Sequence, residues 1–76
     1  MGTEIYTVVD AQGEGPYQAD SPEAAALRAL GQGVLPIHTA AEFPALQVEA
    51  KGATTIVYCR RHSMEDWSVA RHPGDL

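Results

Sequence analysis

The segment that decides the fold is residues 21–33, SPEAAALRALGQG. Ser21 is a preferred residue type at a helix N-cap, because its hydroxyl can accept a hydrogen bond from a free backbone N–H of the first turn. Pro22 fits the first helical position, and Glu23 places a negative charge at the positive end of the helix dipole. The segment therefore predicts a helix over about 22–30.

The interior of this helix is rich in alanine, which is the strongest helix former. Its apolar stripe is narrow and is expected to run through Leu27 and Leu30, while the alanines allow a close approach to a sheet. Gly31 and Gly33 offer the left-handed conformations with which helices commonly end.

The chain ahead of the helix predicts two short strands. Residues 5–9 are β-branched or aromatic, as strands prefer, and their side chains alternate between two faces. The glycines of segment 10–16 supply positive φ angles for a reversal, so residues 17–19 are expected to return as the second strand. Pro16 has no backbone N–H to donate, which favours an edge position for it.

The chain after the helix begins with a segment that is difficult to assign. Residues 34–38 are expected to be extended but irregular because of Pro36, and capping-box spacing predicts one helical turn over 39–42. Alternating and β-branched runs then predict three strands, over 46–51, 54–61 and 67–71. A frayed tail is expected after them.

These elements predict an α+β domain of two layers that spans residues 1–76. The expected order is β-β-α-β-β-β, with an antiparallel sheet of four to five strands and the helix packed on one face. A chain of 76 residues has room for one domain only, and 45% hydrophobic residues is ordinary globular usage.

Composition also bears on compartment. The one cysteine, Cys59, cannot form the paired framework of a small secreted domain, so a cytoplasmic protein is expected. The N-terminal residues lack the basic and apolar regions of a signal peptide, and the apolar runs are too short to span a bilayer. No membrane partner is therefore expected.

The charge distribution is the most informative functional feature. Residues 1–50 hold seven acidic residues and one basic residue, which gives −6, whereas residues 51–76 hold three acidic and four basic ones, which gives +1. An acidic face of this kind attracts a basic protein surface and speeds association. The residues expected to form it are Glu14, Asp20, Glu23 and Glu49. The alternative is a solvated surface that keeps the protein soluble.

A metal or small-ligand site is a second hypothesis. Cys59 and His62 have a Cys-x-x-His spacing, and His72 and His38 are further ligands that zinc accepts. The sequence lacks the second pair that makes zinc spacing diagnostic, and a free cysteine is more simply a small buried hydrophobe. No metal or cofactor is therefore expected.

A third hypothesis is weak binding of single-stranded nucleic acid by Arg60, Arg61 and Arg71, with Tyr58 and Trp67 available for stacking. The net charge of −5 argues against direct nucleic-acid binding, which needs a basic footprint. Strand alternation also places Arg60 and Arg61 on opposite faces, where pairing with Glu49, Glu65 or Asp66 is expected. Trp67 is expected in the core.

Catalysis is not expected. The residue types of a nucleophile, a base and an orienting group are present in Cys59, His62 or His72, and Asp66, but a sheet with one helix offers little concavity to exclude water. The sequence holds no Gly-x-Ser-x-Gly elbow, and its two Gly-x-Gly segments have the context of turns and not of phosphate loops.

The overall plan resembles small acidic proteins of phages and mobile elements, several anti-CRISPR proteins among them. The similarity lies in the short strand pair that leads into the helix start at 19–26 and in the strand meander of 46–71. It implies a non-catalytic inhibitor that occupies the basic, nucleic-acid-binding surface of a CRISPR effector. The resemblance is architectural and transfers no functional residue. Exposed sheet edges in such a small domain also favour a homodimer.

Overall fold

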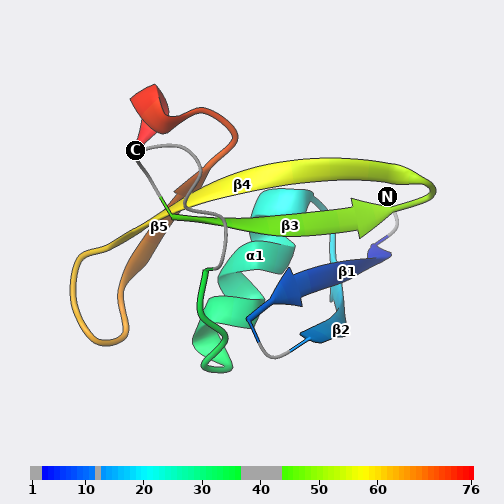
Figure 1. The fold of residues 1–76 in the computed structure, drawn as a ribbon, viewed down its shortest axis with the longest axis horizontal. Coiled ribbons are helices and arrows are strands. Elements are labelled where there is room, and N and C mark those ends of the chain that lie inside the picture. The colour runs from blue at the N-terminus through cyan, green and yellow to red at the C-terminus, as the bar shows by residue number, and fades with distance from the viewer. Residues whose placement is uncertain (1–2, 12, 37–43) are drawn as a thin grey trace.

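The computed structural model describes residues 3–11, 13–36 and 44–76. Within them the chain forms five strands, one α-helix and one short 3-10 helix. These elements are β1 (Glu4–Asp10), β2 (Gly13–Ala19), α1 (Pro22–Gly31), β3 (Ala45–Ala50), β4 (Ala53–Arg61), β5 (Trp67–Ala70) and η1 (Pro73–Asp75). The predicted α+β class, with one α-helix and an antiparallel sheet, is confirmed (Figure 1).

The five strands form one antiparallel sheet in the order β2-β1-β3-β4-β5. β3 lies at its centre, where Val48 is opposite Val8 of β1 and Leu46 is opposite Val57 of β4. The two edges are β2 and β5. The edge position expected for Pro16 is confirmed, since this residue lies in β2 opposite Thr7.

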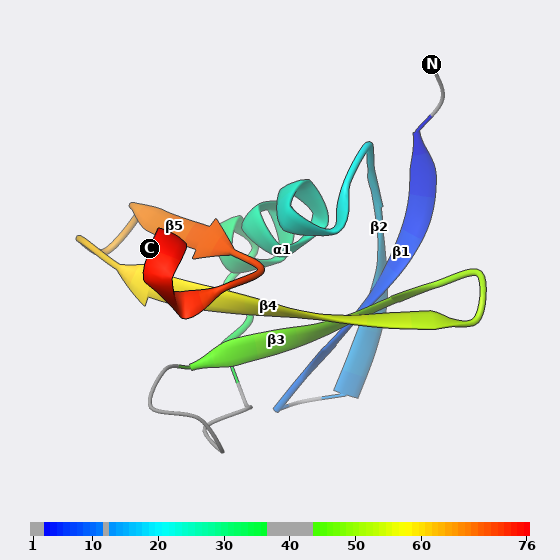
Figure 2. The ribbon, with the colours of Figure 1, turned by 90° about the horizontal axis from the view of Figure 1, so that it is seen from above.

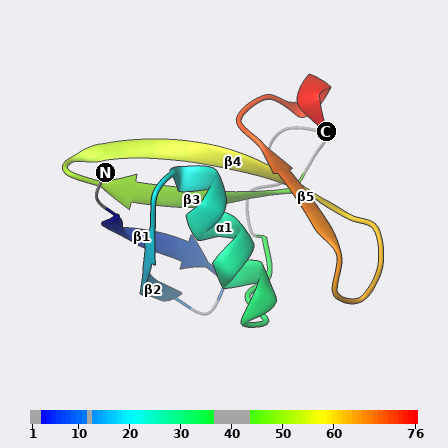
Figure 3. The same ribbon diagram turned by 180° about the vertical axis from the view of Figure 1, so that it is seen from behind.

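α1 covers one face of the sheet and contacts all five strands (Figures 2 and 3). Figure 2 shows the helix between the β1–β2 hairpin and β5, so the twisted sheet curls around it. The predicted cap is confirmed, because the Ala24 N–H donates to the Ser21 hydroxyl over 3.1 Å. The helix has ten residues, and within the described ranges no helix has the length and apolar character needed to cross a bilayer.

The face that α1 turns to the sheet consists of three alanines and one leucine. Ala25, Ala26, Ala29 and Leu30 are buried, whereas Leu27 is 44% exposed. The predicted stripe through Leu27 is therefore wrong. Positions 25, 26, 29 and 30 share one side of the helix at 3.6 residues per turn, and position 27 lies outside this side, so the Leu27 side chain points toward solvent.

The core lies between this helix face and the inner side of the sheet. Its largest fully buried side chains come from the three central strands: Val8, Leu46, Val48, Val57 and Cys59. Tyr17, Trp67 and Val69 of the edge strands pack against its margin. The core is small, and its largest contributions come from β3 and β4.

Several segment boundaries differ from the predicted ones. The chain reverses within the predicted segment 10–16, but Gly13 already pairs with Asp10, so the predicted start of the second strand at Tyr17 is wrong and β2 starts at Gly13. The positive φ expected of a glycine in this segment is confirmed, since Gly13 has φ +132°, which other residues rarely adopt. The tail predicted to fray forms η1. Residues 34–36 belong to no helix or strand, and the turn predicted over 39–42 lies outside the described residues.

The β3–β4 hairpin contains a residue type that its turn does not favour. Ala50 pairs with Ala53, and the two residues between them, Lys51 and Gly52, have φ +52° and +77°. Two successive positive φ angles are characteristic of the type I′ turn, whose preferred sequence is Asn-Gly. Lys51 also forms an ion pair with Glu4 at 3.1 Å, but the lysine side chain is 79% exposed.

We predict that Lys51→Asn stabilises the protein. The left-handed conformation costs a residue such as lysine about 1–2 kcal/mol, and asparagine recovers a part of this, which exceeds an exposed ion pair of about 0.5 kcal/mol. Urea unfolding measures the difference. Lys51→Ala is the control, because it removes the ion pair without relieving the turn and should not stabilise. An unchanged or lower midpoint for Lys51→Asn contradicts the prediction.

The buried face of α1 consists mainly of alanine. Enlarging a buried alanine should therefore cost more stability than truncating the exposed leucine of the same helix. Ala29→Leu should destabilise the protein by about 1–3 kcal/mol, since it overpacks a fully buried site. Leu27→Ala removes a larger side chain but from an exposed position, so it should cost about 0.5 kcal/mol or less. Thermal unfolding followed by circular dichroism compares the two. A larger loss in Leu27→Ala than in Ala29→Leu contradicts the packing described here.

Candidate functional site

The four acidic residues expected to form one surface lie in two regions of the molecule. Glu14 is exposed on β2 and lies opposite Val9, on the sheet face away from α1. Glu49 lies on the same face, opposite Thr7. Asp20 is exposed in the connection between β2 and α1, and Glu23 lies in the first turn of the helix. The four residues therefore do not share a single flat face.

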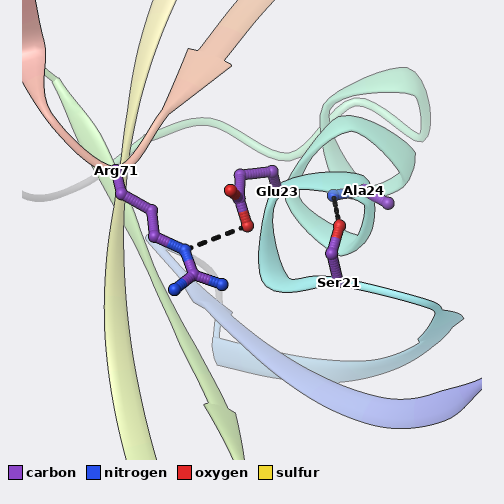
Figure 4. A network of polar contacts seen from close by, with 4 residues as sticks. All are labelled: Ser21, Glu23, Ala24 and Arg71. Carbon is purple, nitrogen blue, oxygen red and sulfur yellow. Dashed lines mark hydrogen bonds and ion pairs between the residues drawn. The ribbon is translucent and has the colours of Figure 1, made fainter. Parts of the chain in front are cut away.

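Glu23 takes part in a contact within the protein. Its Oε1 lies 3.2 Å from Nε of Arg71, which follows β5 (Figure 4). The same turn carries the Ser21 cap. This ion pair joins residues that the acidic and basic hypotheses had assigned to separate surfaces. It connects the start of α1 to the chain after β5, across 48 residues of sequence.

Glu49 also has a partner, since its Oε2 accepts a hydrogen bond of 2.7 Å from Nε2 of Gln47. It lines an open hollow of about 420 Å³ at the β3–β4 hairpin, together with Ile5, Lys51 and Thr54. Neither of the two ion pairs in the described part of the chain involves Glu14 or Asp20. These two carboxylates are the most accessible of the four.

The end of the molecule near Asp20 has a negative field that acts on Tyr6. Burial of the ring raises the pKa of the Tyr6 hydroxyl above its ordinary value. The charges of Glu4 and Asp20 raise this pKa further, while the Arg71 guanidinium lowers it. Tyr6 therefore lies within reach of the charges of Glu4, Asp20 and Arg71.

The basic residues of the β4–β5 hairpin are separated by strand alternation. Arg61 lies opposite Trp67, and its guanidinium carbon is 5.6 Å from the centre of the indole ring. The same side chain donates to the backbone carbonyls of Ser63 and Met64 over 3.1 and 3.4 Å. Pairing of Arg61 with a carboxylate was expected and is wrong, because these carbonyls and the ring hold it.

Arg60 lies on the opposite face, next to a histidine–serine contact. It is opposite Ser68, whose hydroxyl oxygen is 2.5 Å from Nε2 of His62. With Arg61 turned to the other face and Arg71 held by Glu23, the three arginines of the nucleic-acid hypothesis do not form one clamp. Trp67 is half-buried and packs against the core, as expected.

Cys59 belongs to the core. It is 1% exposed, and its thiol donates weakly to the Val57 carbonyl over 3.5 Å. Burial raises the pKa of this thiol from an ordinary value of 9.0 to about 11, against a smaller lowering by the Leu46 backbone. His62 is exposed, so it does not meet Cys59 in the core. Among the described residues no group of three His, Cys, Asp or Glu side chains is placed to hold a metal ion.

A larger hollow lies between the edge strand β2 and the C-terminal half of α1. It has a volume of about 620 Å³ and is lined by residues 15–18, Arg28, Gly31 and Gln32. Sequence reasoning did not identify it. Its signals were a glycine and a proline within one strand, and an arginine that is the one basic residue of positions 1–50. Only the tertiary structure shows that β2 and Arg28 lie side by side.

Comparison of the chain with protein-family models, with curated proteins and with solved structures finds no match.

The buried thiol predicts a loss of stability at alkaline pH. Between about pH 9 and pH 11 the unfolded chain releases the Cys59 proton while the folded protein retains it, so the free energy of unfolding falls as pH rises. Urea unfolding from pH 7 to pH 10.5 measures this fall. Tyr6 contributes in the same direction, so the test is the difference between the wild type and Cys59→Ala. An equal fall in both proteins contradicts the prediction.

Proposed function

We propose that the protein is a non-catalytic interaction module whose acidic β1–β2 hairpin docks on a basic surface of a partner protein. The observation that carries the proposal is the charge of this hairpin. Residues 3–20 hold four carboxylates and no lysine or arginine: Glu4, Asp10, Glu14 and Asp20. Two of them are exposed: Glu14 lies on β2, at the opposite edge of the sheet from β5, and Asp20 lies in the connection from β2 to α1.

This arrangement gives the molecule two electrically different ends. The β1–β2 hairpin and its connection to α1 carry four acidic side chains, of which Glu4 is paired with Lys51, while residues 53–72 carry three arginines and two acids, with Arg71 paired with Glu23. A partner that presents lysine and arginine is attracted to the first end and approaches with a preferred orientation. Glu49 extends the acidic surface onto β3, whereas Glu23 serves mainly to hold the helix through Arg71.

The most concrete form of the proposal is an inhibitor of a nucleic-acid-handling complex. Basic protein surfaces are typical of nucleic-acid-binding sites, where they neutralise phosphates. A hairpin that presents exposed carboxylates competes for such a surface without chemistry of its own. This form agrees with the resemblance to anti-CRISPR proteins and with a cytoplasmic location.

We predict that Glu14→Lys/Asp20→Lys abolishes partner binding and leaves the fold intact, because both side chains are exposed. The measurement is affinity capture from host lysate, with identification of the retained proteins by mass spectrometry. The wild type should retain a basic nucleic-acid-binding protein at about 50 mM salt and lose it at about 500 mM, as expected for screened charges.

The matched control is Glu65→Lys/Asp66→Lys, which changes the net charge equally at the exposed β4–β5 turn. It should bind as the wild type does. A second measurement titrates the captured partner with its nucleic acid, which the wild-type protein should displace. Equal capture by both double variants, or unaltered nucleic-acid binding, contradicts the proposal.

A further inference from the structure

The groove between β2 and α1 combines a sheet edge with a helix wall. β2 is the outer strand of the sheet, so one side of its backbone has no neighbouring strand within the described residues. Such an edge is a template for an additional extended segment. The groove of about 620 Å³ lies beside this edge and is open to solvent.

Gly15 keeps the strand side of the groove open. A Cβ built at this position would meet Cε2 of Tyr17 at 3.8 Å, which is an ordinary contact. Gly15 also lies outside the set of positive-φ residues. Neither packing nor backbone conformation therefore requires glycine here. A strand glycine without these reasons is typical of places where another backbone or a ligand comes close.

Arg28 supplies the charge of the groove. It is exposed on α1, and its side chain makes no ion pair or hydrogen bond within the described part of the chain. The planar guanidinium fits a carboxylate with two parallel hydrogen bonds. The groove therefore favours a ligand with a carboxylate, which is opposite in charge to the partner surface proposed for the hairpin.

We propose that this groove binds an extended peptide segment of a partner protein, which adds to β2 and places a Glu or Asp side chain against Arg28. Side chains of an added strand alternate between the two faces of the sheet. The residue that meets Arg28 points to the α1 side, next to Gly15 and Tyr17. Its chain neighbours point to the other side, where Glu14 lies. Pro16 withholds one N–H from the new ladder, so the remaining backbone groups and the carboxylate contribute the affinity.

The test uses fluorescence anisotropy with the labelled peptide acetyl-Thr-Val-Glu-Val-Thr-amide. We expect saturable binding and a loss of about 10-fold or more in Arg28→Gln, the size expected for a charged hydrogen-bonded pair. The peptide with Gln in place of Glu should bind the wild type as weakly as the Glu peptide binds Arg28→Gln. With this Gln peptide, the Arg28→Gln substitution should cause no further loss of affinity. Gly15→Val, which fills the groove, should also weaken binding.

The matched control is Arg60→Gln. It makes the same charge change at another arginine that has no side-chain partner in the described residues, but on the sheet face away from α1. It should keep the wild-type affinity. Amide chemical shifts of an isotope-labelled protein should change at residues 14–18 and 28–32 when the peptide is added. No saturable binding by the wild type, equal losses in Arg28→Gln and Arg60→Gln, or shift changes confined to other strands would each overturn the proposal.

This peptide carries no basic residue, so its binding to the groove does not depend on the carboxylates of Glu14 and Asp20. Glu14→Lys/Asp20→Lys should therefore retain the peptide even where it loses the basic partner. Arg28→Gln tests the groove through peptide binding, and Glu14→Lys/Asp20→Lys tests the docking function through capture of the basic partner. The two proposals can therefore fail independently.

Discussion

The close packing of the alanine face of α1 against the curled sheet is the constraint on which the other features depend. Ala25, Ala26 and Ala29 are fully buried, so the helix axis comes near the strands. A sheet that wraps a helix so closely brings both of its edges, β2 and β5, to the sides of the helix. Larger side chains at these positions would lift the helix away and separate it from the edges.

The position of each surface feature follows from this packing. The start of α1 comes near the end of β5, which allows the Glu23–Arg71 ion pair. Its C-terminal half comes near β2, which creates the groove beside Arg28. α1 covers only one face of the sheet. The other face carries Glu14, Glu49 and Arg60, on three different strands.

The two proposed surfaces have opposite charge preferences and belong to the same hairpin. Exposed carboxylates at Glu14 and Asp20 attract a basic surface from a distance, because electrostatic attraction extends over about a Debye length. The groove acts only at contact, through backbone edges and one guanidinium. A partner that satisfies both has a basic surface with an extended segment that carries a carboxylate. Attraction would then set the approach, and the groove would set the register.

Local structure could be predicted from the sequence: the helix and its Ser21 cap, the main strands and the α+β class. These depend on propensity, capping and alternation over a few residues, which a single sequence displays directly. The strand order, the exposure of Leu27, the partner of Glu23 and the meeting of Arg28 with β2 were decided only by the tertiary structure. They join residues far apart in the chain, and periodicity carries no information about which strand lies beside which.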